Sequence, residues 1–115
     1  MQQLIQDMRD MEGLLLPLCE KMMTWDSEKL YEDFQEATQP MTTLVSLLLN
    51  NKQVLSGCGV DVEDVFILGI LEKIVQALEK KDEIQLLDSI YHGYLPWMAK
   101  VRGEMEQYLK QEGQA

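Results

Sequence analysis

The chain contains few of the residues on which enzyme active sites and covalent cross-links depend. Its 115 residues include one histidine, His92, and two cysteines, Cys19 and Cys58. Acid–base or nucleophilic catalysis needs a partner within hydrogen-bond reach of the histidine, and only Asp88, one turn earlier, is placed to provide it. The cysteines form no CxxC pair, and the GCG motif around Cys58 has no lysine after it. We therefore expect no catalytic triad, no disulfide framework and no phosphate loop.

The chain is also poor in positive charge and in long apolar runs. Ten Lys and Arg residues stand against twenty Asp and Glu residues, which gives a formal net charge of −10. This charge repels phosphate groups, and no basic stripe overrides it, so neither nucleic acid nor a membrane surface is an expected partner. No apolar run approaches the roughly 20 residues of a membrane span, and residues 1–13 do not read as a signal peptide. We expect a cytoplasmic protein.

What the chain has in abundance is helical periodicity. Apolar residues recur at alternating steps of three and four, and no segment alternates with a period of two. The stripes are Leu4, Met8, Met11, Leu15, Leu18, Met22 and Trp25; Leu30, Phe34, Ala37, Met41, Leu44 and Leu48; Val65, Leu68, Leu71, Ile74, Val75 and Leu78, with Phe66, Ile67 and Ile70 extending this face; and Ile84, Leu87, Tyr91, Tyr94, Met98, Val101, Met105 and Tyr108. We predict a single all-α domain, an antiparallel four-helix bundle with helices at about 2–24, 27–52, 61–80 and 83–111.

Polar residues mark the boundaries of the predicted helices. Asp26 or Ser27 is the expected N-cap of the second helix, Asp61 of the third and Asp82 of the fourth. Asparagines and glycines indicate a loop over residues 50–64. The other two connections are short, which predicts that helices one and two, and helices three and four, are antiparallel neighbours.

The two halves of the chain resemble each other at an offset of 56 residues. This offset pairs Asp26 with Asp82 and Pro40 with Pro96, and it aligns the apolar residues without a gap. A duplicated αα-hairpin is the economical interpretation, although any two amphipathic hairpins align apolar to apolar to some extent. Because the apolar stripes continue beyond both prolines, we predict that helices two and four bend at these positions rather than end.

An acidic face on the second predicted helix raises an enzymatic alternative. Glu28, Glu32 and Glu36 share this face, and Glu79 precedes Asp82 at helical spacing. Helical nucleotide pyrophosphohydrolases hold Mg²⁺ or Mn²⁺ between carboxylate pairs on facing helices, so a carboxylate–metal hydrolase is one alternative. The three glutamates lie opposite the apolar stripe of their helix, which favours a solvated face. We therefore predict no metal site and no cofactor.

Residues 88–100, DSIYHGYLPWMAK, hold the densest aromatic cluster. Tyr91, Tyr94, Trp97 and Met98 widen the apolar stripe of the fourth helix beyond what a bundle of this size requires. Either the other helices surround this helix, or part of it is exposed to a protein partner or to a second copy of the chain. The eight methionines are compatible with both, because methionine fills cores and also lines adaptable binding grooves. We take these four side chains as candidate partner contacts.

The second predicted hairpin, LEKIVQALEKKDEIQLLDSIYHGYLPWM (71–98), resembles helical hairpins of small acidic bacterial proteins of unknown function, some of them motility-associated. The pattern that carries this resemblance is Ala77-Leu78, Asp82, Leu86-Leu87-Asp88, Tyr91 and Leu95-Pro96. In size, acidity and helical content the chain is also similar to flagellar and type III export chaperones, which clamp an amphipathic segment of a client. We predict a non-enzymatic protein–protein interaction module, with an export-chaperone-like binder and the carboxylate–metal hydrolase as alternatives.

Overall fold

The computed structural model describes residues 1–24 and 28–114, and within them the protein is all-α, as predicted. The helices are α1 (Gln2–Thr24), α2 (Glu28–Asn50), α3 (Lys52–Gly57), α4 (Asp64–Lys80), α5 (Glu83–Ser89) and α6 (Leu95–Gln114). A π-helical turn, η1 (Ile90–Tyr94), joins α5 to α6, so that residues 83–114 form one continuous helix.

The described residues therefore contain five separate helices, whereas the sequence predicts four. The additional helix, α3, lies in the stretch 50–64 that is predicted to be a loop. Its Leu55 is buried, as are Val60 and Val62 in the segment that follows. These three apolar side chains cover one end of the core, which explains why the segment folds back onto the protein instead of remaining a solvated loop.

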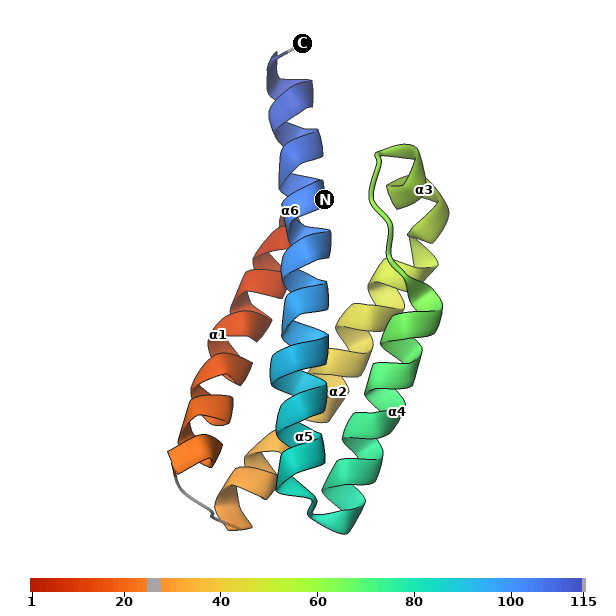
Figure 1. Ribbon diagram of the computed structural model, residues 1–115. Coiled ribbons are helices and arrows are strands. Elements are labelled where there is room, and N and C mark those ends of the chain that lie inside the picture. The colour runs from red at the N-terminus through yellow and green to blue at the C-terminus, as the bar shows by residue number, and fades with distance from the viewer. Residues whose placement is uncertain (25–27, 115) are drawn as a thin grey trace.

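The long helices alternate in direction along an elongated molecule. In Figure 1, α1 and α4 run one way, and α2 and the continuous helix α5–α6 run the other way. The molecule measures 50 × 24 × 19 Å along its principal axes. Helix α1 contacts α2 and α6, and α4 contacts α2 and α5. The axes of α1 and α2 diverge with distance from the residues that connect them (Figure 1).

One face of each long helix forms the core. The largest fully buried side chains are Met8, Leu15, Met22, Phe34, Met41, Leu48, Ile67, Ile74, Leu86, Ile90, Tyr94 and Met98. The stripes predicted for residues 4–22 and 30–48 supply most of the buried residues of α1 and α2. In α4 the prediction is partly wrong, because Val65, Leu68 and Val75 are exposed, whereas Ile67 and Ile70, which were predicted only to extend the stripe, are buried.

The helix boundaries confirm one predicted cap and correct another. The side chain of Asp82 accepts a hydrogen bond from the Gln85 backbone N–H at 3.1 Å, so it caps α5 as predicted. Asp61 does not cap α4, which begins three residues later, and instead its side chain accepts from the Glu63 backbone N–H at 3.0 Å. The proposed cap at residues 26–27 lies outside the described residues.

Neither Pro40 nor Pro96 ends its helix, in agreement with the prediction, but the helices around these two prolines differ. Pro40 lies within the α-helix α2, whereas Pro96 follows the π-helical turn η1 directly. The Leu95 N–H donates to the carbonyl of Ile90, five residues back, so this turn contains one more residue than an α-helical turn.

An ion-pair cluster connects α1 to α6. The Arg102 guanidinium donates to both carboxylate oxygens of Glu12, at 3.0 and 3.1 Å, and to Glu106 at 3.3 Å. Arg9 donates to the same Glu106 oxygen at 2.5 Å. The hydrogen bonds from Arg9 and, secondarily, Arg102 lower the pKa of the Glu106 carboxyl below its ordinary value. Bidentate geometry makes such pairs specific, so the cluster fixes how α6 lies against α1.

Candidate functional site

The four aromatic-cluster residues proposed as partner contacts have different environments in the structure. Tyr91 is 36% exposed, whereas Tyr94, Trp97 and Met98 are buried in the core. A buried side chain cannot reach a partner while the helices stay packed, so Tyr94, Trp97 and Met98 are corrected to core residues. Of the four, only Tyr91 lies at the surface. Its ring contacts the ring of His92 edge to face, and the two ring centroids are 5.1 Å apart.

Both polar atoms of the buried aromatic residues are hydrogen-bonded. The Tyr94 hydroxyl donates to the Met41 carbonyl at 3.1 Å, and the Trp97 indole N–H donates to the Val62 carbonyl at 2.7 Å. Burial raises the pKa of the Tyr94 hydroxyl. These bonds join η1 and α6 to α2 and to the segment before α4, which is a structural role.

The π-helical turn explains why two residues of the predicted fourth stripe that precede Tyr94, Ile84 and Tyr91, are exposed instead of buried. Leu86, Ile90, Tyr94 and Met98 follow one another at four-residue steps, and all four are buried. On a regular helix of 3.6 residues per turn, this spacing would rotate steadily away from the core. The extra residue of the π-helical turn takes up the difference, so the buried face before the turn lies one residue earlier than a continuous α-helix predicts.

A glycine lets α4 approach the π-helical turn closely. A Cβ atom placed on Gly93 would lie 2.8 Å from Cδ1 of Ile70. Ile70 is 8% exposed and lies on the inner face of α4. Gly93 therefore has a packing reason to lack a side chain, within the stretch that the sequence marks as a possible aromatic site.

The carboxylates of the hydrolase alternative lie at the surface. Glu32, Glu36, Glu79 and Asp82 are exposed, and the side chain of Glu28 lies outside the described residues. Across residues 1–24 and 28–114, no group of three or more His, Cys, Asp or Glu side chains is placed to hold a metal ion.

The two cysteines differ in accessibility. Cys19 is buried, and desolvation, reinforced by the charge of Glu20, raises its pKa to about 12. Cys58 is half-buried. A thiol that stays protonated and covered is a poor nucleophile, so Cys19 is a core residue.

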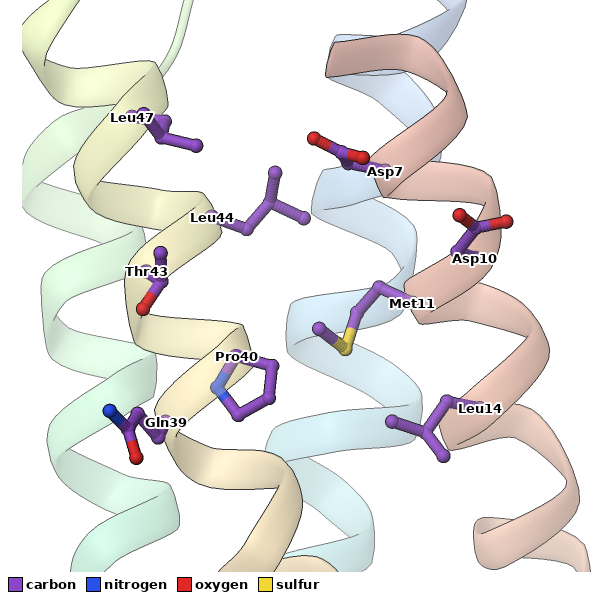
Figure 2. Close-up of a pocket in the computed structure, with 9 residues that line it drawn as sticks. All are labelled: Asp7, Asp10, Met11, Leu14, Gln39, Pro40, Thr43, Leu44 and Leu47. Atoms are coloured by element: carbon purple, nitrogen blue, oxygen red, sulfur yellow. The ribbon is translucent and has the colours of Figure 1, made fainter. Parts of the chain in front are cut away.

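A surface depression lies between α1 and α2, where these helices diverge. It is a groove of about 490 Å³, to which α1 contributes Met11 and Leu14 and α2 contributes Pro40, Leu44 and Leu47. Figure 2 shows the side chains of Met11 and Leu44 directed from the two helices into the space between them. Leu14 and Leu47 are 46% and 41% exposed, so apolar surface stays in contact with water along this groove. We refer to it as the α1/α2 groove.

Two carboxylates lie on the α1 side of the α1/α2 groove. Asp7 and Asp10 line it together with the apolar residues (Figure 2). Asp7 accepts a hydrogen bond from the Gln3 side-chain amide at 2.8 Å, and Asp10 from that of Gln6 at 2.9 Å. No Lys or Arg of the described residues forms an ion pair with either carboxylate. The α1 side of the groove is therefore negatively charged, and no Lys or Arg of the described residues neutralises it.

The sequence analysis did not predict that Leu14 and Leu47 line a groove. Leu14 and Leu47 lie next to the predicted stripes, in the runs LLL (14–16) and LLL (47–49). A helix that packs on one side can bury only part of such a run. The two LLL runs indicate that some apolar residues stay exposed, because each run contains more consecutive apolar residues than one buried helix face requires.

Two smaller apolar surfaces accompany the groove. Val65, Phe66, Leu68 and Val75 form an exposed strip on α4, where Val65 is 83% exposed. A second pocket, of about 340 Å³, lies beside Tyr91 at the α1–α6 contact. The α1/α2 groove, at about 490 Å³, is larger than this second pocket.

Comparison of the chain with protein-family models, with curated proteins and with solved structures gave no match. Within residues 1–24 and 28–114, no helix has both the length and the apolar character needed to cross a bilayer.

Proposed function

We propose that this protein is a non-enzymatic interaction module whose α1/α2 groove binds an amphipathic helix of a partner protein. The observation that carries the proposal is the apolar lining of the groove, with Leu14 and Leu47 both left partly exposed between two divergent helices. Amphipathic helices bind other proteins by placing their apolar face in such grooves. Residues 7–14 span about two helical turns along α1, enough to contact several anchor residues of a bound helix.

The proposal includes an architecture and a location that follow from the sequence. We propose that α1, α2, α4 and α5–α6 constitute an antiparallel four-helix bundle that arose from two duplicated αα-hairpins, and that the protein acts in the cytoplasm. An export-chaperone-like role would use the same groove, with an amphipathic client segment as its occupant. The flexible side chain of Met11 suits a groove that accepts helices of varied sequence.

A partner protein is preferred to a second copy of the chain as the occupant. The chain carries a net charge of −10, and Asp7 and Asp10 already make the groove acidic. Docking an equally acidic chain there would bring like charges together. A partner with a different charge balance meets no such repulsion.

The test measures binding of labelled amphipathic peptides of about 18 residues, or five helical turns. One peptide has leucine on its apolar face and lysine on its polar face, and the other has glutamate in place of lysine. Binding is followed by fluorescence anisotropy and located by NMR shift changes at groove residues. Leu14→Gln with Leu47→Gln should weaken whichever peptide binds by about tenfold or more, because about two-fifths of each leucine remains to be buried.

The matched control removes as much exposed apolar surface elsewhere. Val65→Gln with Ile84→Gln alters two side chains that are more exposed than Leu14 and Leu47 and lie outside the groove. This variant should bind the peptides as the wild type does. If neither peptide binds, the proposal is contradicted. Analytical sedimentation tests the alternative occupant. If the wild type is a dimer and the double variant Leu14→Gln with Leu47→Gln is a monomer, the groove binds a second copy of the chain.

A further inference from the structure

We infer that the α1/α2 groove selects a basic amphipathic helix, which places a bulky apolar side chain beside Pro40 and a lysine or arginine beside Asp7. This inference rests on the proposed function and specifies the chemistry of its partner. It is carried by a comparison of the two halves of the chain, because the second half fills with its own side chains the positions that the first half leaves open.

The burial pattern relates the two halves at two offsets. Up to the π-helical turn, residues 56 apart correspond, so that Leu30 and Phe34 match the buried Leu86 and Ile90. After the turn the offset is 57, because the turn contains one extra residue. The buried residues Met41, Leu44 and Leu48 then match the equally buried Met98, Val101 and Met105.

Pro40, which lines the groove, departs from this correspondence. At the offset of 57, the exposed Pro40 corresponds to the buried Trp97. The Trp97 indole packs into the core and donates to the Val62 carbonyl, whereas Pro40 contributes only a small ring to the lining of an open groove. The second half thus contains a large aromatic side chain where the first half has unfilled space.

The charges show the same difference. Asp7 corresponds to Glu63, and the groove residue Thr43 corresponds to Lys100. Glu63 forms an ion pair with Lys100, so the second half neutralises its own carboxylate. Asp7 has no such cation, because a threonine stands at the position of the lysine. The missing elements are a bulky apolar group and a positive charge, and a basic amphipathic helix carries both.

Leu14 supports the same conclusion. Its counterpart 56 residues on is Ile70, which is 8% exposed because it packs onto Gly93, whereas Leu14 is 46% exposed. The helix pair α1/α2 is therefore less completely packed than its counterpart at the position where the groove lies. Apolar surface and unpaired charge occur together there, which is the combination that an amphipathic ligand complements.

The test uses three labelled peptides: an amphipathic peptide of leucine, one tryptophan and lysine; the same peptide with glutamate for lysine; and a scrambled lysine peptide that has no apolar face. The wild type should bind the amphipathic lysine peptide most tightly. Asp7→Asn with Asp10→Asn should weaken that binding about two- to tenfold, the range expected for two partly exposed ion pairs. Added salt should reduce the difference between the lysine and glutamate peptides.

A second variant imitates the ion pair of the other half. Thr43→Lys places a cation where Lys100 stands in the corresponding pair, so it should weaken binding of the lysine peptide without removing any acidic residue. Thr43 is exposed, and the substitution leaves the core unchanged. Glu79→Gln with Asp88→Asn changes the net charge as much as the double aspartate variant but alters exposed carboxylates outside the groove. It should leave the affinity unchanged.

The outcomes separate this inference from the proposed function. If the lysine and glutamate peptides bind the groove equally well, the groove binds helices but does not select basic ones, and the inference fails alone. If the scrambled lysine peptide binds as tightly as the amphipathic one, only net charge is being measured, and the inference also fails. If neither amphipathic peptide binds, the proposed function fails together with the inference.

Discussion

The close contact between Gly93 and Ile70 leads to a quantitative prediction about stability. Gly93→Ala would place a Cβ atom 2.8 Å from Cδ1 of Ile70, which is too short for two carbon atoms, so the isoleucine must move. The remaining near contacts, to Cγ1 and Cγ2 of Ile70, are at 3.5 Å and are ordinary. The perturbation is therefore a clash with a single methyl group that Ile70→Val removes.

The magnitude follows from opposing contributions. Overpacking a filled core costs about 1–3 kcal/mol, and replacing glycine by alanine in a helix returns up to about 1 kcal/mol. Gly93→Ala alone should therefore lower the free energy of unfolding by about 1 kcal/mol. Ile70→Val alone should lower it by about 0.5–1.5 kcal/mol. In the double variant the clash is absent and the helical gain remains, so the double variant should be more stable than the sum of the single changes by about 2 kcal/mol.

The assay is urea-induced unfolding of the wild type, both single variants and the double variant, followed by far-UV circular dichroism. The four free energies of unfolding form a double-mutant cycle, which isolates the contact between the two residues. If the two single effects add to within about 0.5 kcal/mol, the residues do not contact one another as described and the reasoning is refuted. Equal denaturant slopes across the four proteins would verify that one transition is being compared.

Four further predictions concern other parts of the structure. Trp97→Phe removes the indole donor and leaves the buried Val62 carbonyl unpaired, so the free energy of unfolding should fall by about 1–3 kcal/mol, and a negligible loss in urea unfolding would contradict the hydrogen bond. Iodoacetamide should alkylate Cys58 in the native protein but Cys19 only in denaturant, and equal rates by mass spectrometry would show that Cys19 is accessible. The arginine partners of Glu106 lower its pKa in the folded protein, so this carboxylate stabilises the fold above about pH 4.5, and that contribution is lost as the pH falls through the lowered pKa. Glu106→Gln should therefore reduce the decline of thermal stability in acid, and an unchanged pH profile would argue against the ion pairs. Mg²⁺ or Mn²⁺ should leave the melting temperature unchanged, whereas a rise that grows with metal concentration would support the hydrolase alternative.

The features that depend on local sequence were predictable. Helix α1 begins at Gln2 as predicted and is helical through Thr24, the last residue described before 25–27, because its apolar periodicity is regular from Leu4 to Met22. Asp82 caps α5 as expected, since an N-cap acts over only a few residues. Both features follow from interactions within one helix, which a single sequence contains in full.

The features that depend on contacts between helices were not predictable in the same way. Periodicity showed that α4 is apolar but not which side of it faces the core, so Val65 and Leu68 were assigned to a face that the structure exposes. The α1/α2 groove exists because two helices diverge, and divergence is a property of the pair. The sequence did show an excess of apolar residues around Leu14 and Leu47, but not the space that they border.

The candidate partner contacts illustrate the same limit. Tyr91, Tyr94 and Trp97 are close in sequence, and a regular helix would place them on one broad apolar face. The π-helical turn changes their relative orientation, and of the three only Tyr91 stays exposed. The run of apolar residues at four-residue steps from Leu86 was the available signal for such a turn.

The π-helical turn also has a consequence for how the length of this chain can change. Deleting a single residue within Ile90–Tyr94 would let the turn close into an ordinary α-helical one, and the buried faces on either side would stay aligned with the core. A deletion elsewhere in α5 or α6 would instead rotate the following residues by about 100° relative to the preceding ones. The turn is thus the place in this helix where natural relatives could differ in length by one residue and keep the same fold.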